Sequence, residues 1–374
     1  MKILLAAGIF YPDVGGPAIH VRKIAEALSN NGYEVIVIAY GDDKTDKKFP
    51  FKVIRVSRNN NKILQWLKYQ YLALKYAFSC KMVYAFDPTA AGIPARIAAF
   101  IFRRPFIIRI GGDPIWERTV EMNQRFITIV DYYKNSFYKI DKPILYWLIK
   151  RLVSSADRIV VYGQFFKDFY VNYFEADSNN ITIIKNPVLQ TEKASDIISD
   201  NPTILFAGRF VSYKNLPFVI KVVASVRNKI KKGNLVLIGS GPEKNKLLDL
   251  VKELNAEGYV IFKDSLPQEE LFKNIRNSTV CIGPALSEFN PNFILESLSL
   301  GKPVLLTKGN GLSITLPEEM LFDPFNESEL ENRIVSMFDK DNYRKIIQTV
   351  NSLPLNQSWD NVIDAHLSII KSFK

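Results

Sequence analysis

Residues 1–40 read MKILLAAGIFYPDVGGPAIHVRKIAEALSNNGYEVIVIAY, and this stretch decides the fold. The apolar run Lys2–Ala7 predicts a buried strand, and a loop rich in glycine and proline follows it. Apolar residues then recur at the spacing of one helix face, with Pro17 in the first turn and Gly32 just past the end. The run Glu34–Ala39 predicts a second buried strand. A strand, a helix and a strand in this order predict a βαβ unit with a parallel sheet.

The same alternation continues along the rest of the chain in two series. In the first half, further strands are expected at Phe51–Val56, Met82–Tyr84, Phe106–Ile110, Arg158–Tyr162 and Ile181–Ile184. A polar segment near residues 188–202 is typical of an interdomain linker. After it, strands are expected at Thr203–Gly208, Asn234–Gly239, Tyr259–Phe262, Thr279–Ile282 and Pro303–Thr307, with a closing helix at about Ser358–Ser372. The sequence therefore predicts an α/β protein with two Rossmann-like, doubly wound parallel-sheet domains facing a cleft, which bind ligands at the carboxyl ends of their strands.

Composition and charge narrow the classes of protein that fit. The 374 residues are 47% hydrophobic and 23% charged, which excludes a disordered chain and a small disulfide scaffold. The net charge of +11 indicates an anionic partner. Residues 1–200 hold 28 Lys and Arg against 19 Asp and Glu, whereas residues 201–374 hold 21 against 19. Because the excess lies in the first half, the two halves are expected to have different partners.

The remaining sequence features exclude several kinds of site. Cys80 and Cys281 are far apart and His20 and His366 are the only histidines, so neither a disulfide framework nor a zinc site is expected. Reduced thiols suggest an intracellular protein. The sequence has no apolar run of about 18 residues, and its first residues are expected to form a strand rather than a signal peptide.

Three loops that follow predicted strands carry candidate binding residues. Gly15-Gly16-Pro17 would let the backbone approach an anion, and an ordinary tight turn is the alternative. In the segment GRFVSYKN, Arg209 and Lys214 would hold a diphosphate, and ordinary surface cations are the alternative. Gly239-Ser240-Gly241-Pro242 offers backbone donors to a ligand, or it is only a turn.

Two glutamates in the segment PALSEFNPNFILESLSLGKPV, Glu288 and Glu296, are the most informative candidates. On one helix, eight residues correspond to about 12 Å of rise, so the two carboxylates could not share a proton as in a glycosidase. They are expected to contact different parts of one ligand. For Glu288, an interaction with the helix dipole is the alternative. Glu296 lies in an apolar run and needs a partner such as a sugar hydroxyl.

In this order and spacing, the segments resemble the retaining glycosyltransferases of the GT-B fold, family 4 (glycosyltransferase group 1). The resemblance covers nearly the whole chain and includes YAFDPTAAGIPA around Asp87, the KNPV segment and the C-terminal Trp helix. It implies an acceptor-binding Rossmann-like domain at residues 1–190 and a nucleotide-sugar-binding Rossmann-like domain at 200–355. Residues 356–374 would form a helix that packs back on the first domain.

The resemblance also implies a role for each candidate residue. Arg209 and Lys214 would bind the diphosphate of a nucleotide-sugar donor and stabilise the leaving group without a metal. Glu296 would hold the ribose hydroxyls, and Glu288 would hold the hydroxyls of the donor sugar. The donor-binding residues that the resemblance implies are Gly16, Arg209, Lys214, Gly239, Gly241, Glu288, Phe289, Asn290, Asn292 and Glu296.

Catalysis is expected to involve Asp113 together with Arg209, Lys214 and Glu288. Asp113, in RIGGDPIWE, would lie near the anomeric carbon and position or polarise the acceptor, and turn formation is the alternative. Arg109 and Glu117 flank it as weaker candidates. In this family the reaction is thought to be a front-side displacement that retains the anomeric configuration.

Two departures from the family pattern bear on specificity. Many relatives have glycines after the first glutamate, whereas this chain has Phe289-Asn290-Pro291-Asn292, and Pro291 has no N–H. The donor sugar is therefore left open. In the loop after the strand Tyr259–Phe262, where many relatives have Gly, this chain has Lys263-Asp264-Ser265, which leaves the nucleotide base open. Asp339-Lys340-Asp341 matches the metal motif of the other glycosyltransferase fold but does not follow a predicted strand, so a solvated turn is expected. No metal and no other cofactor is expected.

Residues 63–81 interleave basic and apolar side chains. Such a helix suits the surface of an anionic bilayer, but a sheet-covering helix with a cationic outer side fits equally well. Nucleic-acid binding fits less well, because none of the usual modules is present.

The sequence therefore predicts a cytoplasmic enzyme, with the inner face of the cell membrane as a further location. It would transfer a sugar with retention from a nucleotide-diphosphate sugar to a lipid-linked or saccharide acceptor in cell-envelope or exopolysaccharide synthesis. Two alternatives stay open. One is a sugar-nucleotide epimerase of the same architecture, which the spacing of the candidate residues disfavours. The other is a non-catalytic nucleotide-sugar-binding partner of a membrane-associated polysaccharide assembly complex.

Overall fold

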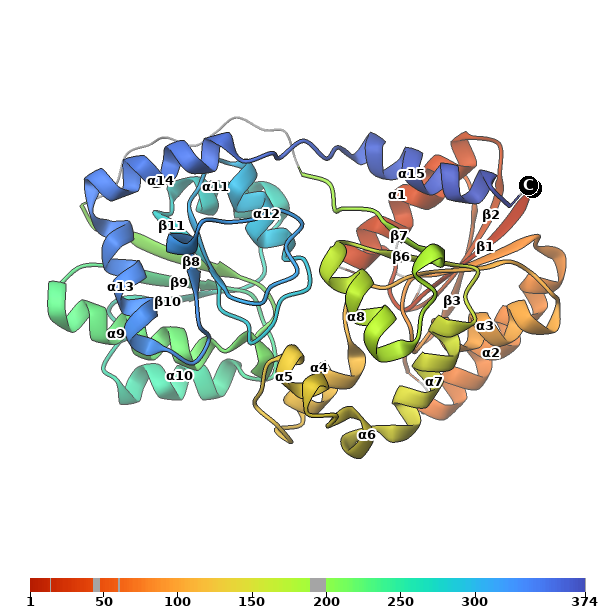
Figure 1. Ribbon diagram of the computed structural model, residues 1–374, viewed down its shortest axis with the longest axis horizontal. Helices are drawn as coiled ribbons and strands as arrows, with labels where there is room; N and C mark the ends of the chain where they lie inside the picture. The colour runs from red at the N-terminus through yellow and green to blue at the C-terminus, as the bar shows by residue number, and fades with distance from the viewer. Residues whose placement is uncertain (14, 43–47, 60, 189–199, 374) are drawn as a thin grey trace. The chain divides into compact units, whose positions relative to one another are not determined.

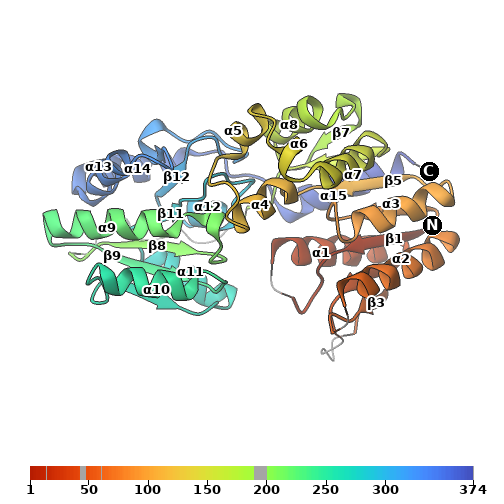
Figure 2. The same ribbon diagram turned by 90° about the horizontal axis from the view of Figure 1, so that it is seen from below.

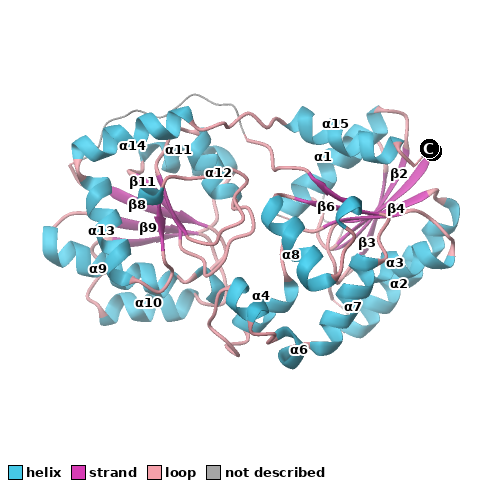
Figure 3. Cartoon of the chain, in the orientation of Figure 1, coloured by secondary structure: helices cyan, strands magenta, loops and turns pink. Residues whose placement is uncertain are grey.

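The computed structural model describes residues 1–13, 15–42, 48–59, 61–188 and 200–373 and divides the chain into two compact units (Figure 1). The first unit consists of Met1–Ile115, Ser136–Pro187 and Trp359–Lys374, and the second consists of Trp116–Asn135 and Val188–Ser358. Each unit holds a parallel sheet with helices on both faces (Figure 3). This arrangement confirms the predicted α/β class with two Rossmann-like domains.

The unit boundaries differ from the expected domain boundaries in one respect. Trp116–Asn135 lies in the first half of the sequence but packs with the second unit. The closing helix packs with the first unit. Most of the expected linker, residues 189–199, lies outside the described residues.

In the first unit, the described residues form a seven-stranded parallel sheet in the order β3-β2-β1-β4-β5-β6-β7. Its strands are β1 (Lys2–Ala7), β2 (Glu34–Tyr40), β3 (Lys52–Val56), β4 (Met82–Ala85), β5 (Phe106–Arg109), β6 (Arg158–Val161) and β7 (Ile181–Ile183). Its helices are α1 (Gly16–Asn30), α2 (Lys62–Ser79), α3 (Gly92–Ile101), α6 (Tyr138–Asp141), α7 (Pro143–Ser154), α8 (Gln164–Phe174) and α15 (Trp359–Lys371). A 3-10 turn covers Ser178–Asn180, and α4 (Pro114–Glu121) begins in this unit and ends in the second.

Helices cover both faces of this sheet. α1 and α15 contact each other on one face, and α2, α3 and α7 lie next to one another on the other (Figures 1 and 2). α1 buries Val21, Ile24 and Leu28, as its helical spacing predicts. Pro17 lies in its first turn, and Gly32 follows its end with a φ of 77°. A left-handed backbone of this kind strongly favours glycine.

A buried polar network joins α15 to the first sheet. His366 Nδ1 lies 2.8 Å from the Tyr84 hydroxyl, and its Nε2 lies 2.7 Å from the Arg109 guanidinium. Arg109 also donates to Asn186 Oδ1 at 3.0 Å and lies 4.7 Å from the centroid of the Tyr162 ring. Burial and the nearby Arg109 charge hold the pKa of His366 well below its ordinary value. The imidazole is therefore neutral in the folded protein.

In the second unit, the described residues form a six-stranded parallel sheet in the order β10-β9-β8-β11-β12-β13. Its strands are β8 (Thr203–Ala207), β9 (Asn234–Ile238), β10 (Val260–Lys263), β11 (Val280–Gly283), β12 (Val304–Thr307) and β13 (Leu321–Phe322). Its helices are α5 (Ile129–Lys134), α9 (Leu216–Ile230), α10 (Lys244–Glu253), α11 (Gln268–Asn277), α12 (Asn292–Ser299), α13 (Glu327–Phe338) and α14 (Lys340–Ser352). 3-10 turns cover Ser212–Lys214 and Glu318–Met320. α9 and α10 lie on one face of the sheet, and α11 and α12 lie on the other (Figures 1 and 3).

Candidate functional site

The candidate residues of the second unit gather at the carboxyl edge of its sheet, where the strand order changes direction. β8 and β11 are neighbours in the sheet although β9 and β10 separate them in the chain. Arg209 and Lys214 follow β8, and Glu288 follows β11. In doubly wound sheets, such a switch point is where ligands bind. The fold thus brings together Lys214 and Glu288, which are 74 positions apart in the sequence.

Lys214 and Glu288 form a shielded ion pair. Lys214 Nζ donates to Glu288 Oε1, and the two side chains are 17% and 11% exposed. The Lys214 ammonium also lies 5.4 Å from the centroid of the Tyr213 ring. A shielded charge without a partner would be costly, so each side chain stabilises the other in this position. An anion that binds here would meet a cation that is already in place.

Backbone hydrogen bonds fasten the loop that carries Glu288. The Leu286 N–H donates to the Tyr213 carbonyl at 2.9 Å, which joins the loop after β11 to the loop after β8. The Gly311 N–H donates to the Glu288 carbonyl at 2.7 Å. Glu288 is therefore positioned through its backbone as well as through its side chain.

The helical geometry assumed for the spacing between Glu288 and Glu296 is wrong. Glu288 lies in the loop after β11, because α12 begins only at Asn292. Pro291 explains this boundary, since it lacks an N–H and disfavours a helical conformation in the residue before it. The distance inferred from a continuous helix therefore does not apply.

Glu296 lies on α12 and has a partner in the protein. Its carboxylate accepts a hydrogen bond from Gln268 Nε2 at 3.2 Å. Burial raises the pKa of Glu296 to about 6, and the Gln268 hydrogen bond opposes this shift. The sequence did not single out Gln268, because α11 and α12 are brought together only by the fold.

A segment from the first half of the sequence packs against both loops. Trp116, on α4, is fully buried, and its ring centroid lies 5.5 Å from that of Tyr213 and 5.8 Å from that of Phe289. Tyr213 directly precedes Lys214, and Phe289 directly follows Glu288. One indole therefore contacts the chain neighbours of both charged residues. Sequence reasoning missed Trp116, although this large aromatic residue stands three positions after Asp113.

Arg209 differs from Lys214 in its exposure. Its side chain is 68% exposed, and its guanidinium lies 3.8 Å from the Glu121 carboxylate on α4. An exposed pair at this distance is weak. Arg209 can therefore turn towards an anion at little cost.

Two of the three glycines expected to bind a donor, Gly239 and Gly241, are also required by the packing of the second unit. A Cβ on Gly239 would lie 1.9 Å from the Gly208 carbonyl oxygen, and one on Gly241 would lie 2.3 Å from the Phe210 carbonyl oxygen. These approaches let the loops after β8 and β9 pack together. The Gly239 N–H also donates to the Lys263 carbonyl at 2.9 Å. The backbone donors predicted for the Gly239–Pro242 segment would therefore come from residues other than Gly239.

The segment after Glu288 has a polar side chain whose hydrogen-bonding groups are unused. Nδ2 and Oδ1 of Asn290 are shielded from solvent and have no partner among the described residues. Phe289 is buried, and Asn292 is the exposed first residue of α12. Unpaired polar atoms of this kind are rare in proteins, which makes Asn290 a candidate for contact with a ligand.

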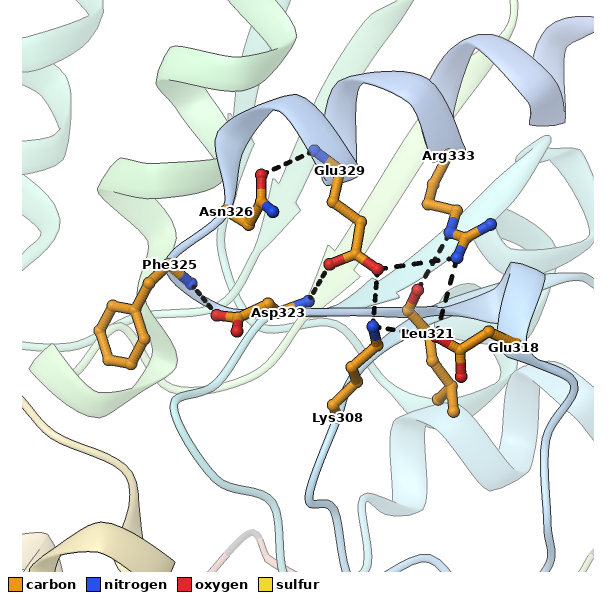
Figure 4. Close-up of polar contacts among 8 residues, drawn as sticks. All are labelled: Lys308, Glu318, Leu321, Asp323, Phe325, Asn326, Glu329 and Arg333. Carbon is orange, nitrogen blue, oxygen red and sulfur yellow. Dashed lines mark hydrogen bonds and ion pairs between the residues drawn. The ribbon is translucent and has the colours of Figure 1, made fainter.

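A cluster of ion pairs lies beside these loops, at the carboxyl ends of β12 and β13 (Figure 4). Lys308 Nζ lies 2.9 Å from the Glu318 carboxylate and 2.8 Å from that of Glu329. Arg333 Nε donates to the Leu321 carbonyl at 3.1 Å. The Lys308 hydrogen bond lowers the pKa of Glu329, which keeps this carboxylate charged.

This cluster supports both candidate loops. Glu329 accepts a hydrogen bond from the Asp323 N–H at 2.9 Å, and the adjacent Pro324 carbonyl accepts one from Asn215 Nδ2 at 2.9 Å. Asn215 directly follows Lys214. Lys308 begins the loop whose Gly311 binds the Glu288 carbonyl. The cluster therefore has a structural role in positioning the Lys214–Glu288 pair.

The remaining candidate residues do not belong to the loops around the Lys214–Glu288 pair. Gly16, in the first unit, is the first residue of α1, and Asp113 is buried in the same unit. Asp113 Oδ1 accepts a hydrogen bond from the Ile115 N–H at 3.1 Å, which is the turn-forming role that the sequence left open. Arg109 belongs to the α15 network, and Glu117 lies on α4 within the second unit.

The structure has a large cavity in the first unit and a small cavity in the second. One of about 690 Å³ opens in the first unit beside Lys2, Glu34 and Lys52, at the amino ends of three strands. This is the opposite end of the strands from the edge where a doubly wound sheet binds its ligand. A cavity of about 100 Å³ in the second unit is lined by Val211 and Ser212 of the Arg209 loop. We therefore identify the candidate site from its side chains rather than from cavity size.

The described parts of the chain show neither a metal-binding cluster nor a membrane-spanning helix. No group of three or more His, Cys, Asp or Glu side chains there is placed to hold a metal ion. In the motif Asp339-Lys340-Asp341, the Asp339 side chain caps α14 by accepting hydrogen bonds from the N–H groups of Asp341 and Asn342. None of the described helices has the length and apolar character needed to cross a bilayer.

Comparison with protein families defines the class of this protein. Residues 14–189 match the model described as Glycosyltransferase Family 4, and residues 189–350 match the model described as Glycosyl transferases group 1. These two models together span residues 14–350, and the chain belongs to this family of glycosyltransferases.

Individual relatives agree with this class. The chain is 24% identical, over 79% of its length and 68% of the relative's, to an uncharacterised glycosyltransferase of Methanocaldococcus jannaschii. It is 26% identical, over 90% of its length and 91% of the relative's, to the N-acetylgalactosamine-N,N'-diacetylbacillosaminyl-diphospho-undecaprenol 4-alpha-N-acetylgalactosaminyltransferase of Campylobacter jejuni. The solved structure of Anabaena HepE in complex with UDP and glucose matches with a TM-score of 0.75 at 16% identity, covering 100% of both chains. This match confirms the GT-B fold.

Proposed function

We propose that the protein transfers a sugar, with retention of anomeric configuration and without a metal, from a nucleotide-diphosphate sugar to a lipid-linked or saccharide acceptor. The observation that carries this proposal is the shielded Lys214–Glu288 pair at the switch point of the second sheet, with Arg209 in the same loop. Two cations at this edge suit a diphosphate, and an adjoining carboxylate suits sugar hydroxyls.

In the proposed reaction, the bond between the sugar's anomeric carbon and the diphosphate breaks, the acceptor hydroxyl forms the new bond on the same face, and its proton passes to the leaving phosphate oxygen. Negative charge then develops on the leaving phosphate oxygen. Lys214 and Arg209 stabilise that charge electrostatically, which is the role of a metal ion in other transferases. Because the Lys214–Glu288 pair exists before binding, little reorganisation is needed at this step.

The carboxylates would hold the two ends of the donor. Glu288 contacts Lys214 through Oε1, and its other oxygen would accept a hydroxyl of the donor sugar. Glu296 would accept the ribose hydroxyls, and the amide of Asn290 would bind the sugar. Phe289, Asn292 and the backbone of Gly241 would complete the donor contacts.

We assign the acceptor to the first unit. Gly16 would let the α1 loop approach the donor, and Asp113 would position the acceptor hydroxyl. The name of the Campylobacter relative includes diphospho-undecaprenol as part of its acceptor. This name favours a lipid-linked acceptor at the inner face of the cell membrane. Cell-envelope or exopolysaccharide synthesis is the setting that fits such an acceptor.

A panel of UDP-, GDP- and ADP-sugars tests this proposal through thermal shift and slow donor hydrolysis. UDP-sugars come first, because the solved structure of Anabaena HepE holds UDP. One donor is expected to stabilise the wild type and to be hydrolysed, and Lys214→Met should lose both effects. Lys229→Met is the matched control, since Lys229 pairs with Glu331 elsewhere in the second unit. If no nucleotide-sugar stabilises the wild type, the proposed donor site is wrong.

The same panel separates the second candidate function, a non-catalytic nucleotide-sugar-binding partner of a polysaccharide assembly complex. The observation that favours it is the Phe289-Asn290-Pro291-Asn292 segment, which replaces glycines found in many relatives. A donor that binds but is neither hydrolysed nor transferred, even with a lipid-linked acceptor extract, would support this candidate.

A further inference from the structure

Three neighbouring helices expose an unusual amount of apolar surface on the first unit. Ile144, Phe100 and Ile63 are 75%, 72% and 70% exposed. The residues that we call the outer apolar surface are Ile63, Leu64, Leu67, Tyr71 and Phe78 of α2, Ile97, Phe100 and Ile101 of α3, and Ile144 and Trp147 of α7. α2 contacts α3, and α3 contacts α7, on the same face of the sheet (Figures 1 and 2). These side chains therefore belong to one outer helical layer.

The outer apolar surface is not needed to cover the sheet. α2 buries Tyr69, Ala73 and Ala77, which lie four residues apart on the side towards the strands. Leu64, Leu67, Tyr71 and Phe78 recur at helical spacing on the exposed side. A helix that covers a sheet at the surface of a protein normally has a polar outer side. Large exposed apolar surfaces of this kind mark a site that meets another apolar phase or a partner.

Basic side chains are interleaved with this surface, and acidic ones are missing from its helices. The basic residues are Lys62, Lys68 and Lys75 on α2, Arg96 on α3, Arg103 and Arg104 just after α3, and Lys150 and Arg151 on α7. α2, α3 and α7 contain no Asp or Glu. Arg96 and Arg151 lie 5.6 and 5.8 Å from the ring centroids of Phe100 and Trp147. The surface is therefore apolar and positively charged at the same time.

We propose that the outer apolar surface docks the protein on a bilayer that contains anionic lipid. The apolar side chains would enter the headgroup region, and the lysines and arginines would bind lipid phosphates. A bilayer fits better than a second copy of the chain, because two surfaces of the same positive charge repel each other. The inference goes beyond the transfer reaction and does not depend on it. It would place the first unit beside a lipid-linked acceptor.

Vesicle sedimentation tests the charge requirement with the full chain. The wild type should sediment with phosphatidylcholine vesicles that contain phosphatidylglycerol, and much less with phosphatidylcholine alone. Lys68→Gln with Lys75→Gln should weaken binding by about thirtyfold, since each basic residue near the surface contributes about fivefold. Lys221→Gln with Lys252→Gln is the matched control, because these exposed lysines lie on α9 and α10 of the second unit. The control should bind like the wild type.

A second variant tests the apolar requirement, with one substitution on each helix: Leu64→Ser, Phe100→Ser and Ile144→Ser. It should lose vesicle binding by about tenfold or more while keeping the wild-type unfolding temperature, because all three side chains are exposed. Donor hydrolysis without vesicles should be unchanged, which separates this test from that of the proposed function.

Three results would overturn the inference. The first is that the wild type fails to sediment with anionic vesicles. The second is that the lysine control loses binding as strongly as Lys68→Gln with Lys75→Gln. The third is that the wild type self-associates in sedimentation velocity without binding vesicles, whereas the serine variant is monomeric. That last result would assign the surface to a second copy of the chain.

Discussion

The outer helices of the two units differ, although both cover a parallel sheet of the same kind. α2, α3 and α7 of the first unit expose large apolar side chains, whereas α9, α10, α11 and α12 of the second expose none in the described part of the chain. The second unit instead exposes charges of both signs, such as Lys221, Lys252 and Glu269. Covering a sheet needs an apolar side only towards the strands, so the apolar outer side of the first unit requires another explanation.

The carboxyl edges of the two sheets differ as well. In the second unit, this edge carries the shielded Lys214–Glu288 pair beside an exposed Arg209. In the first unit, Arg109 is buried against a neutral His366 and binds α15 to the sheet. The same fold therefore presents cations to a ligand in one unit and uses a cation for internal packing in the other.

The largest expected effect is the loss of stability when Trp116 is replaced. This loss would show that the second unit depends on Trp116–Asn135, a segment from the first half of the sequence. Trp116→Ala should lower the free energy of unfolding by about 3–5 kcal/mol, because a fully buried indole leaves a cavity. Denaturant unfolding measures this change. Trp147→Ala in the first unit is the matched control and should cost at most about 0.5 kcal/mol, since Trp147 is 55% exposed. Equal costs for the two variants would contradict the described packing.

The next effect concerns the charged edge of the second unit. Lys214→Met should lower the rate of sugar transfer by about 100- to 1000-fold, because the leaving diphosphate loses a preorganised cation. It should also lower stability, because Glu288 would be shielded without a partner.

Initial-rate and unfolding measurements on a second variant separate these two effects. Lys214→Met combined with Glu288→Gln should regain stability but not activity. A double variant that regains activity would contradict the catalytic role of Lys214.

A smaller effect is expected from the titration of Glu296. The pKa of Glu296 is raised to about 6, so its carboxylate gains a proton as the pH falls through that value. Nucleotide-sugar affinity should then fall by about tenfold, because a protonated acid accepts ribose hydroxyls poorly. Calorimetric titration at about pH 7.5 and pH 5 measures it, since roughly nine tenths of the Glu296 carboxylate is protonated at the lower pH. Glu296→Gln should bind weakly at both pH values, and an unchanged pH dependence in this variant would exclude Glu296 as the cause.

The smallest expected effect comes from the two buried histidines, His20 and His366, which both lie in the first unit. Burial and the Arg109 charge hold the pKa of His366 and His20 well below 6.5, so the unfolded chain binds more protons than the folded chain below about pH 6.5. Stability should therefore fall as the pH drops from about 7.5 to 6, by roughly 1 kcal/mol. Thermal unfolding across this range measures the slope. His366→Gln keeps a polar side chain without the titration, and it should reduce the slope; an unreduced slope would rule out this origin.

Much of the fold could be predicted from local patterns. Each central strand is a short apolar run bounded by loop residues, so the β1–α1–β2 order is visible in residues 1–40. Arg209 and Lys214 could be selected for the same reason, since they follow the strand Thr203–Ala207. The sequence could not place the Glu288 side chain, because contacts with distant segments, at Tyr213 and Gly311, fix the loop that carries it.

Contacts between distant segments could not be predicted from the sequence. Trp116 reaches Tyr213 and Phe289 only because Trp116–Asn135 packs with the second unit. The support of Glu288 by Gly311 depends in the same way on the loop after β12. The helical pattern of α2 showed the interleaved charges, but the exposed residues of α3 and α7 join it only in the folded layer.

The central claim is that the loops after β8 and β11 bind the donor. Amide hydrogen exchange of the wild type, with and without the nucleotide-sugar that gives the largest thermal shift, tests it most directly. We predict slower exchange over residues 208–216 and 284–296 when the donor is present. Unchanged exchange in both stretches, at a donor concentration that stabilises the protein, would contradict the claim.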